Sequence, residues 1–198
     1  PRPTRLQNIL NDIHIYILKK MRRTVKILVI LLAGLASCSC MKSKLEQAYN
    51  NQESRIDQYL TKYEGTNRIV RNGGANRLVL VEGQGDSLSR SGHVSFYYAG
   101  YTFSGSVSVS NLFATNHQAT AEQAGWELTD AEYQLYEINL ADTELIPGLK
   151  DGLFGVRAGE ECEILFSGKY GFGNENFGII PASSALLYKI WVTAVSND

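Results

Sequence analysis

From Asn76 onward the chain combines several short strand-like segments with one helix-like segment, and this combination restricts the possible folds more than any other feature. The helix-like segment is residues 145–153, where Leu145, Leu149 and Leu153 recur every four residues and Pro147 suits a first helical turn. The strand-like segments have alternating or continuous apolar character and cover residues 77–82, 93–98, 161–166 and 186–192. We therefore predict an α+β fold, in which an antiparallel β-sheet is wrapped around one short α-helix.

Residues 39–75 precede this region and have a more polar composition. A partial apolar stripe with spacings of three and four residues predicts one short helix among them. Gly73 and Gly74 mark a boundary at the end of the segment. We therefore assign residues 39–75 to a polar, helical tether and residues 76–198 to the folded domain.

Residues 21–38 have the features of an export signal. Met21 is followed by basic residues, then by an apolar run over residues 27–35 and by small residues before Cys38. The last four residues, Leu-Ala-Ser-Cys, resemble the bacterial lipobox, whose cysteine is acylated and becomes the new N-terminus. The run is only about half of the ~20 residues that span a bilayer. A short membrane anchor or a buried helix is the alternative. Residues 1–20 precede this signal, and we assign them to an upstream, non-native segment.

Removal of the signal changes the charge of the protein. Of the 19 Lys/Arg and 20 Asp/Glu residues, seven and one precede Cys38, which leaves 12 and 19 and a formal charge of −7. An acidic domain lacks the basic footprint that nucleic acid requires, so no nucleic-acid partner is expected.

The cysteines and histidines have no spacing typical of a metal site, so we expect no metal. His93 and His117 are expected to face solvent. Cys162 is expected to be a buried structural residue, although pairing with Cys40 in an oxidising compartment is left open. The acidic run at residues 160–163 is expected to be a solvated strand edge.

Several motifs in the last two thirds of the chain follow one another in the order found in a known family. Residues 145–153 (LIPGLKDGL) are similar to the family helix V-I-x-G-W-x-x-G-L, and residues 98–100 (YAG) to the strand motif Y-T-G. Residues 157–160 (RAGE), 170–173 (YGFG) and 178–188 (GIIPASSALLY) are similar to M-x-x-G-E, Y-A-Y-G and I-I-P-P-x-A-T-L-x-F. The chain thus resembles the FKBP-type peptidyl-prolyl isomerases over roughly residues 78–195.

The chain departs from the family pattern at three pocket positions. The Phe-Asp pair is Phe113-Ala114, the floor tryptophan is Leu149, and the tyrosine that donates to a ligand carbonyl is Phe172. The segment between Phe113 and Tyr136, which includes residues 119–125, is longer than in a minimal family member. We expect this segment to form a lid or rim near the pocket.

The resemblance implies an apolar pocket that promotes rotation about X–Pro bonds without a cofactor, nucleophile or acid–base pair. Leu149 would be the pocket floor, and the backbone N–H of Ile146 would donate to the carbonyl of the bound peptide. Without the resemblance, the same leucines and tyrosines are typical of a packed core. The implied catalytic residues are Tyr98, Phe113, Leu149 and Phe172, and the implied substrate-binding residues are Tyr136, Leu145, Ile146, Ile180 and Tyr188.

These features together predict a lipid-anchored peptidyl-prolyl cis-trans isomerase that assists the folding of exported proteins. Its partners would be proline-containing polypeptides and a membrane, the latter through lipid on Cys38. The alternative is a catalytically weak or inactive FKBP-like binding module, a chaperone or envelope scaffold, which the three departures favour. A structural lipoprotein with no proline-related role is the third hypothesis. Ser39 is compatible with sorting to an outer membrane, so we expect the bacterial cell envelope, with the domain facing the periplasm.

Overall fold

The structure is a computed structural model that describes residues 42–141 and 144–198. The chain divides into two compact units, residues 1–46 and 47–198. The predicted upstream segment and the export signal with Cys38 lie outside the described residues. Within the part of the chain that is described, no helix is both long enough and apolar enough to cross a membrane.

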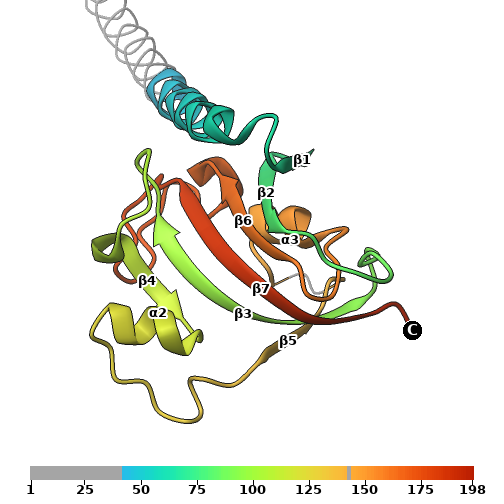
Figure 1. The fold of residues 1–198 in the computed structure, drawn as a ribbon. Coiled ribbons are helices and arrows are strands. Elements are labelled where there is room, and N and C mark those ends of the chain that lie inside the picture. Colours follow the sequence, from blue (N-terminus) through green and yellow to red (C-terminus); the bar gives the residue numbers. More distant parts are fainter. Residues whose placement is uncertain (1–41, 142–143) are drawn as a thin grey trace, which may run out of the picture. The chain divides into compact units, whose positions relative to one another are not determined.

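The second unit is built on an antiparallel β-sheet, which confirms the predicted fold class. Within the described residues the sheet has seven strands in the order β1-β2-β6-β7-β3-β4, and β5 also pairs with β3. Two long strands, β3 and β7, lie side by side through its centre (Figure 1). The strands are β1 (Arg68–Asn72), β2 (Ala75–Val81), β3 (His93–Thr102), β4 (Leu112–Thr115), β5 (Tyr136–Asn139), β6 (Glu161–Phe166) and β7 (Leu186–Ser196). Besides a helical segment that precedes the sheet, the helices are α2 (Gln118–Gln123) and α3 (Pro147–Leu153), with 3-10 turns at Thr61–Tyr63, Val109–Asn111 and Gly168–Tyr170.

The sheet buries apolar side chains on both faces, because successive residues of a strand point to opposite sides. On β3, Phe96 belongs to a core cluster that also contains Leu149 and Leu153 of α3. The next residues of that strand that face the other way, Ala99 and Tyr101, belong to a second cluster. The helix α3 and the pocket described below therefore lie on one face only.

The second face is covered by a helical segment that precedes the sheet. Residues 47–60 are helical, and Ile56, Tyr59 and Leu60 are buried in the second cluster. The following strand β1 pairs with β2 in continuous register. The predicted boundary at residue 76 is therefore placed too late, because residues 47–75 belong to the same unit as the domain. A helix is present in the predicted tether, but it is not short, since residues 42–60 are all helical.

Two glycines allow α3 to lie close against the sheet. A Cβ atom on Gly148 would come within 2.3 Å of the Phe166 ring, and one on Gly152 within 2.1 Å of Ile164 Cγ2. Glycine lowers intrinsic helix stability. This short helix is therefore held by packing and by Pro147 in its first turn.

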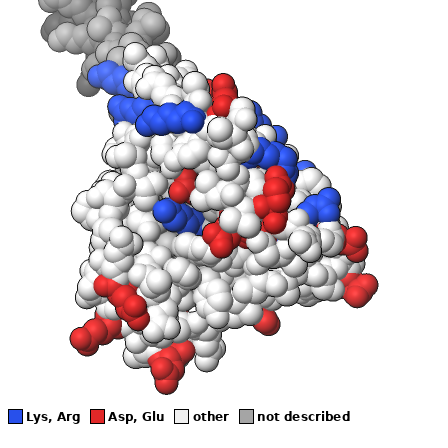
Figure 2. Space-filling model, viewed as in Figure 1, with Lys and Arg blue, Asp and Glu red and all other residues white. Residues whose placement is uncertain are grey.

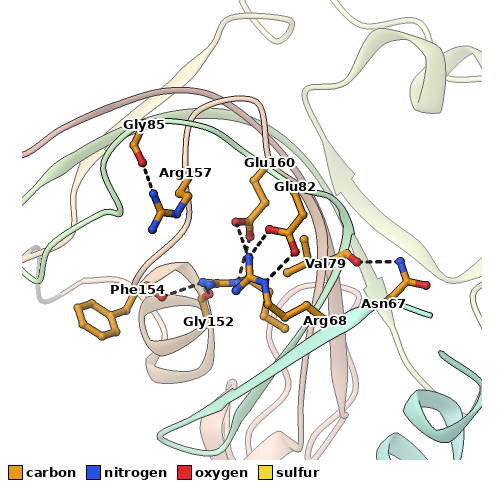
Figure 3. Close-up of polar contacts among 10 residues, drawn as sticks. Asn67, Arg68, Val79, Glu82, Gly85, Gly152, Phe154, Arg157 and Glu160 are labelled. Carbon is orange, nitrogen blue, oxygen red and sulfur yellow. Dashed lines mark hydrogen bonds and ion pairs between the residues drawn. The ribbon is translucent and has the colours of Figure 1, made fainter. Parts of the chain in front are cut away.

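The acidic run at residues 160–163 is not the solvated edge that the sequence predicts. Glu160 has 0% exposure, and its Oε1 lies 3.1 Å from Nε of the buried Arg77. Arg77 Nη1 also donates to the carbonyl oxygens of Gly152 at 2.8 Å, in the last turn of α3, and of Phe154 at 2.7 Å, the residue that caps this helix. Figure 3 shows Glu160, Gly152 and Phe154 converging on this point. Burial raises the pKa of Glu160, and Arg77 partly opposes the rise.

Two residues of β6, the strand that follows Glu160, are buried as well. Glu163 accepts a hydrogen bond from the Tyr59 hydroxyl at 2.7 Å, which joins β6 to the helical segment over residues 47–60. Cys162 is buried and free, which confirms its predicted structural position. A charged residue is classed as exposed from sequence alone, and only the partners supplied by distant segments allow these carboxylates to be buried.

The long segment between β4 and β5 does not form a lid over the pocket. Its helix α2 follows β4 (Figure 1), and His117, just before α2, stacks on Trp191 of β7 with ring centroids 3.9 Å apart. The Asn116 side chain holds the segment to β3, since its Oδ1 accepts from Tyr98 N–H at 2.6 Å and its Nδ2 donates to Gln134 O at 2.9 Å. His117 is therefore half-buried rather than solvent-facing, whereas His93 is exposed as expected.

Candidate functional site

A pocket of about 390 Å³ opens on the face of the sheet that carries α3. Eight of the nine predicted pocket residues line it: Tyr98, Phe113, Tyr136, Leu145, Leu149, Phe172, Ile180 and Tyr188. They come from β3, β4, β5, β7, α3, the residues just before α3 and the loop after β6, so that segments far apart in sequence build one cavity. The structure thus brings the predicted set together, while the role of each residue stays a prediction.

The pocket has a leucine at its base and aromatic rings around it. Leu149 is buried on α3, where its neighbours Gly148 and Gly152 press the helix against the sheet. The Phe113 ring lies 5.7 Å from the Tyr188 ring at an interplanar angle of 82°, an edge-to-face arrangement. Gly100, between them, is required, because a Cβ atom there would meet Phe113 Cζ at 2.6 Å and Tyr188 Cε1 at 3.1 Å.

The aromatic wall continues across β3 to β5. The Tyr136 ring lies 5.5 Å from Phe96 and 5.9 Å from Tyr98, and Tyr98 lies 6.4 Å from Tyr188. Both Phe96 and Ala114 also line the pocket, although neither is among the predicted site residues. Their positions in the sequence could have indicated this, because Phe96 shares a strand face with Tyr98 and Ala114 follows Phe113.

The lining residues of the pocket include no Asp, Glu, Lys, Arg or His among those described. The only polar side-chain atoms of the lining residues are the hydroxyls of Tyr98, Tyr136 and Tyr188. Burial raises the pKa of Tyr98 and of Tyr188, so both phenols stay protonated at neutral pH. The pocket can therefore offer apolar contact and neutral hydrogen bonds, and its lining side chains offer no charged acid or base.

A loop after β6 supplies apolar residues at the pocket mouth that the sequence reading missed. Phe177 and Ile180 exchange backbone hydrogen bonds of 3.0 and 2.9 Å across a two-residue turn. Gly178 begins this turn with φ +56°, which glycine adopts without strain. Phe177 and Ile179 are 60% and 76% exposed, and Phe177 stacks on Phe172 with centroids 4.3 Å apart. The apolar run before Pro181 could have indicated this rim.

Ile146 is the one predicted site residue that does not line the pocket. It is half-buried against the core and precedes Pro147 as the N-terminal cap of α3. Its carbonyl accepts hydrogen bonds from the backbone N–H groups of Leu149 and Lys150, each at 3.1 Å. Its side chain is thus structural, and the predicted role of its N–H toward a peptide is unaffected by this placement.

A second, polar pocket of about 410 Å³ lies beside α2 and is lined by Tyr97, which alternates with Tyr98 and so faces the other side of β3. Its lining residues mix amide, imidazole and carboxylate groups.

Among the described residues, no three His, Cys, Asp or Glu side chains are arranged to hold a metal ion. On the face drawn in Figure 2, the positive side chains lie in the upper part, whereas negative side chains are spread more widely and reach the lower edge, with wide uncharged areas between them.

A family model described as FKBP-type peptidyl-prolyl cis-trans isomerase matches residues 86–193, which extend from before β3 into β7 and include the whole pocket. The chain belongs to this family. Its FKBP domain is accordingly assigned to the peptidyl-prolyl cis-trans isomerases, the class of enzyme that the motifs predict.

Individual relatives of the FKBP domain are distant. FK506-binding protein 1 of Aspergillus oryzae is 21% identical over 117 residues, which cover 59% of this chain and 94% of that protein. The crystal structure of the three FKBP domains of wheat FKBP73 has a TM-score of 0.52 at 17% identity, and the match covers 67% of this chain and 52% of that chain. The chain therefore spans about half of the wheat structure. The crystal structure of FkpA from Escherichia coli has a TM-score of 0.52 at 16% identity and covers 99% of both chains. At these identities the structures show a shared fold.

Proposed function

We propose that the FKBP domain is a lipid-anchored peptidyl-prolyl cis-trans isomerase that assists the folding of exported proteins. The observation that carries the proposal is the uncharged aromatic pocket, into which eight of the nine residues expected from the family motifs converge. The anchor rests on the sequence Leu35-Ala36-Ser37-Cys38, and Ser39 supports a location at the outer membrane, facing the periplasm.

The pocket suits this reaction because of what happens to the amide during rotation. Rotation breaks the amide resonance at a cost of about 20 kcal/mol, and the twisted amide has less charge separation than the planar one. An apolar environment therefore favours the twisted form, and binding it more tightly than the planar form lowers the barrier. In this proposal the proline ring rests on Leu149 between the rings of Phe113 and Tyr98, and Phe172 closes the opposite side.

A measurement of exchange without proteases tests the catalytic part of the proposal. The chain from Ser39 onward is expected to accelerate cis/trans exchange of a peptide with a single X–Pro bond, observed by two-dimensional exchange NMR. An unchanged exchange rate at high protein concentration would contradict an isomerase function. The anchor is tested separately: Cys38→Ser should abolish incorporation of labelled fatty acid and release the protein from the membrane fraction, whereas Cys40→Ser should not.

A second function, that of a binding module for unfolded polypeptides, is favoured by the rim of the pocket. Phe177 and Ile179 expose apolar side chains next to a pocket that has Leu149, Ala114 and Phe172 where the family pattern has tryptophan, aspartate and tyrosine. Exposed apolar surface at a pocket mouth suits transient contact with unfolded chains. A domain that suppresses client aggregation but leaves proline exchange unchanged would support this second function over the first.

A further inference from the structure

The side chain of Tyr188 is the most buried polar group of the pocket and has no protein partner. Tyr188 is 7% exposed, whereas Tyr98 is half-buried and Tyr136 is exposed. No hydrogen bond joins the Tyr188 hydroxyl to any of the described residues. Among the described residues, the polar side-chain atoms that are fully enclosed and lack a hydrogen-bond partner belong to Arg77, Glu160 and Ser167. The Tyr188 hydroxyl is not one of them. It is therefore not sealed in the core but opens onto the pocket that it lines.

The orientation of the Tyr188 ring is fixed by its neighbours. It lies edge-to-face with Phe113 at 5.7 Å and nearly parallel to Phe166 at 6.1 Å. Its backbone pairs with Gly100 on one side and Ile164 on the other, and Gly100 has no side chain to compete for the space. The hydroxyl is therefore a preorganised group rather than a mobile one.

The described part of the fold makes no use of this hydroxyl, because none of its groups bonds to it. Since the hydroxyl opens onto the pocket, a ligand that fills the pocket displaces its water and leaves the donor without an acceptor unless the ligand supplies one. Phenylalanine would fill the same volume without this cost on binding. The hydroxyl is thus a feature that the bare fold does not need, and a bound ligand is the partner that its position offers.

The chemistry of the reaction decides which ligand atom benefits from this donor. In the planar amide the nitrogen lone pair is delocalised and the carbonyl oxygen is the better acceptor. When the bond twists, the nitrogen becomes pyramidal and regains a lone pair, while the oxygen loses negative charge. A donor to the oxygen therefore stabilises the planar state more, and only a donor to the nitrogen accelerates rotation.

Resting on the proposed isomerase function, we propose that the Tyr188 hydroxyl is a further catalytic group, which donates a hydrogen bond to the proline nitrogen of the twisted amide. The phenol is a neutral donor throughout the physiological range, because burial and the nearby Tyr98 and Tyr136 phenols raise its pKa. No proton is transferred and no bond is formed, since the hydrogen bond exists only while the nitrogen is pyramidal. The low polarity of the surrounding rings strengthens such a bond.

The test is Tyr188→Phe, which removes the hydroxyl and keeps the ring. The matched control is Tyr101→Phe, since Tyr101 is 5% exposed on the opposite face of the sheet. Both variants are compared with the wild-type chain from Ser39 onward by exchange NMR on a single-proline peptide, over a range that reaches saturation. We expect Tyr188→Phe to lower kcat by roughly twofold to tenfold with KM unchanged, the range of one hydrogen bond. Tyr101→Phe should change neither constant.

Thermal unfolding gives an independent readout. Because the hydroxyl has no partner in the folded domain, Tyr188→Phe should leave the Tm unchanged or raise it. A raised KM with unchanged kcat would show that the hydroxyl contacts the planar ground state, and a lowered Tm would show a structural partner; either result overturns the inference. Unchanged kinetics in Tyr188→Phe beside an active wild type also overturn it and leave the proposed function standing. An inactive wild type would overturn both.

Discussion

Arg77 Nη1 lies 2.8 Å from the carbonyl oxygen of Gly152, so a buried side chain of β2 satisfies the C-terminal end of the helix that carries the pocket floor. The last carbonyl groups of a helix have no partner within it, and basic side chains can supply one. Here the same guanidinium also neutralises Glu160 (Figure 3 shows the carboxylate beside Gly152 and Phe154). The position of Leu149 in the pocket thus depends on residues outside the pocket.

Replacement of Arg77 by methionine should destabilise the domain strongly. It would leave Glu160 buried without its closest cation and two carbonyl groups without a donor, and the loss of one partner from a buried pair costs about 3–5 kcal/mol. The measurement is the free energy of unfolding from denaturant titration. Arg55→Met is the control, since Arg55 is exposed and surface substitutions change stability by about 0.5 kcal/mol or less. Equal losses in the two variants would contradict this account.

Replacement of Leu149 by aspartate should lower isomerase activity at least tenfold. The carboxylate would stand at the base of a pocket lined by no charged group, where the desolvation of a charge is expensive. We expect kcat/KM in the exchange experiment to fall by about tenfold or more, since each 1.4 kcal/mol corresponds to a factor of ten. Leu80→Asp, at an exposed leucine of β2, should retain wild-type activity. Full activity in Leu149→Asp would show that the pocket is not the active site.

The exposed rim of the pocket, Phe177 and Ile179, should contribute to the binding of unfolded polypeptides but not to the stability of the domain. The double variant Phe177→Ser, Ile179→Ser removes two exposed apolar side chains, so its free energy of unfolding should change by less than about 0.5 kcal/mol for each surface position. Its suppression of aggregation of a reduced, unfolded client should weaken, as seen by light scattering. Val109→Ser is the control, because Val109 is also exposed but does not line the pocket. Undiminished suppression would remove the rim from the proposed binding surface.

The stability of the domain should decrease on mild acidification because of His117. Burial against Trp191 lowers the pKa of His117, and Glu161 only partly opposes this. Above its unfolded value of 6.5 the imidazole is neutral in both states and contributes nothing. As the pH falls below 6.5, the unfolded chain binds the proton more readily than the folded one, so stability is lost until the folded pKa is passed.

The measurement for His117 is the Tm as a function of pH between about 7.5 and 5 in the wild type and in His117→Phe, which keeps a stacked ring without the titrating group. The difference in Tm between the two proteins should grow as the pH falls through 6.5 and then level off. A difference that is constant with pH, or that shrinks on acidification, would contradict the depressed pKa.

The sequence by itself determined four of the strands, the helix α3 and most of the residues that line the pocket. Alternating residues predict β3, the strand of residues 161–166 is found with those bounds, and Pro147 with the leucine spacing predicts α3. These signals are local, since a strand or helix repeats its face every few residues. The family motifs made it possible to predict the pocket residues, because each motif lies on or next to a strand or helix that the sequence also predicts.

Only the tertiary structure decided which residues of those elements are covered and by what. Glu160 and Glu163 become buried because Arg77 and Tyr59, from distant segments, supply their partners. The helical residues 47–60 join the domain because β6 and β7 leave an apolar face uncovered, and the segment before α2 packs on Trp191 instead of closing the pocket. In each case the free energy comes from a contact between segments far apart in the chain, and no local pattern encodes such a contact.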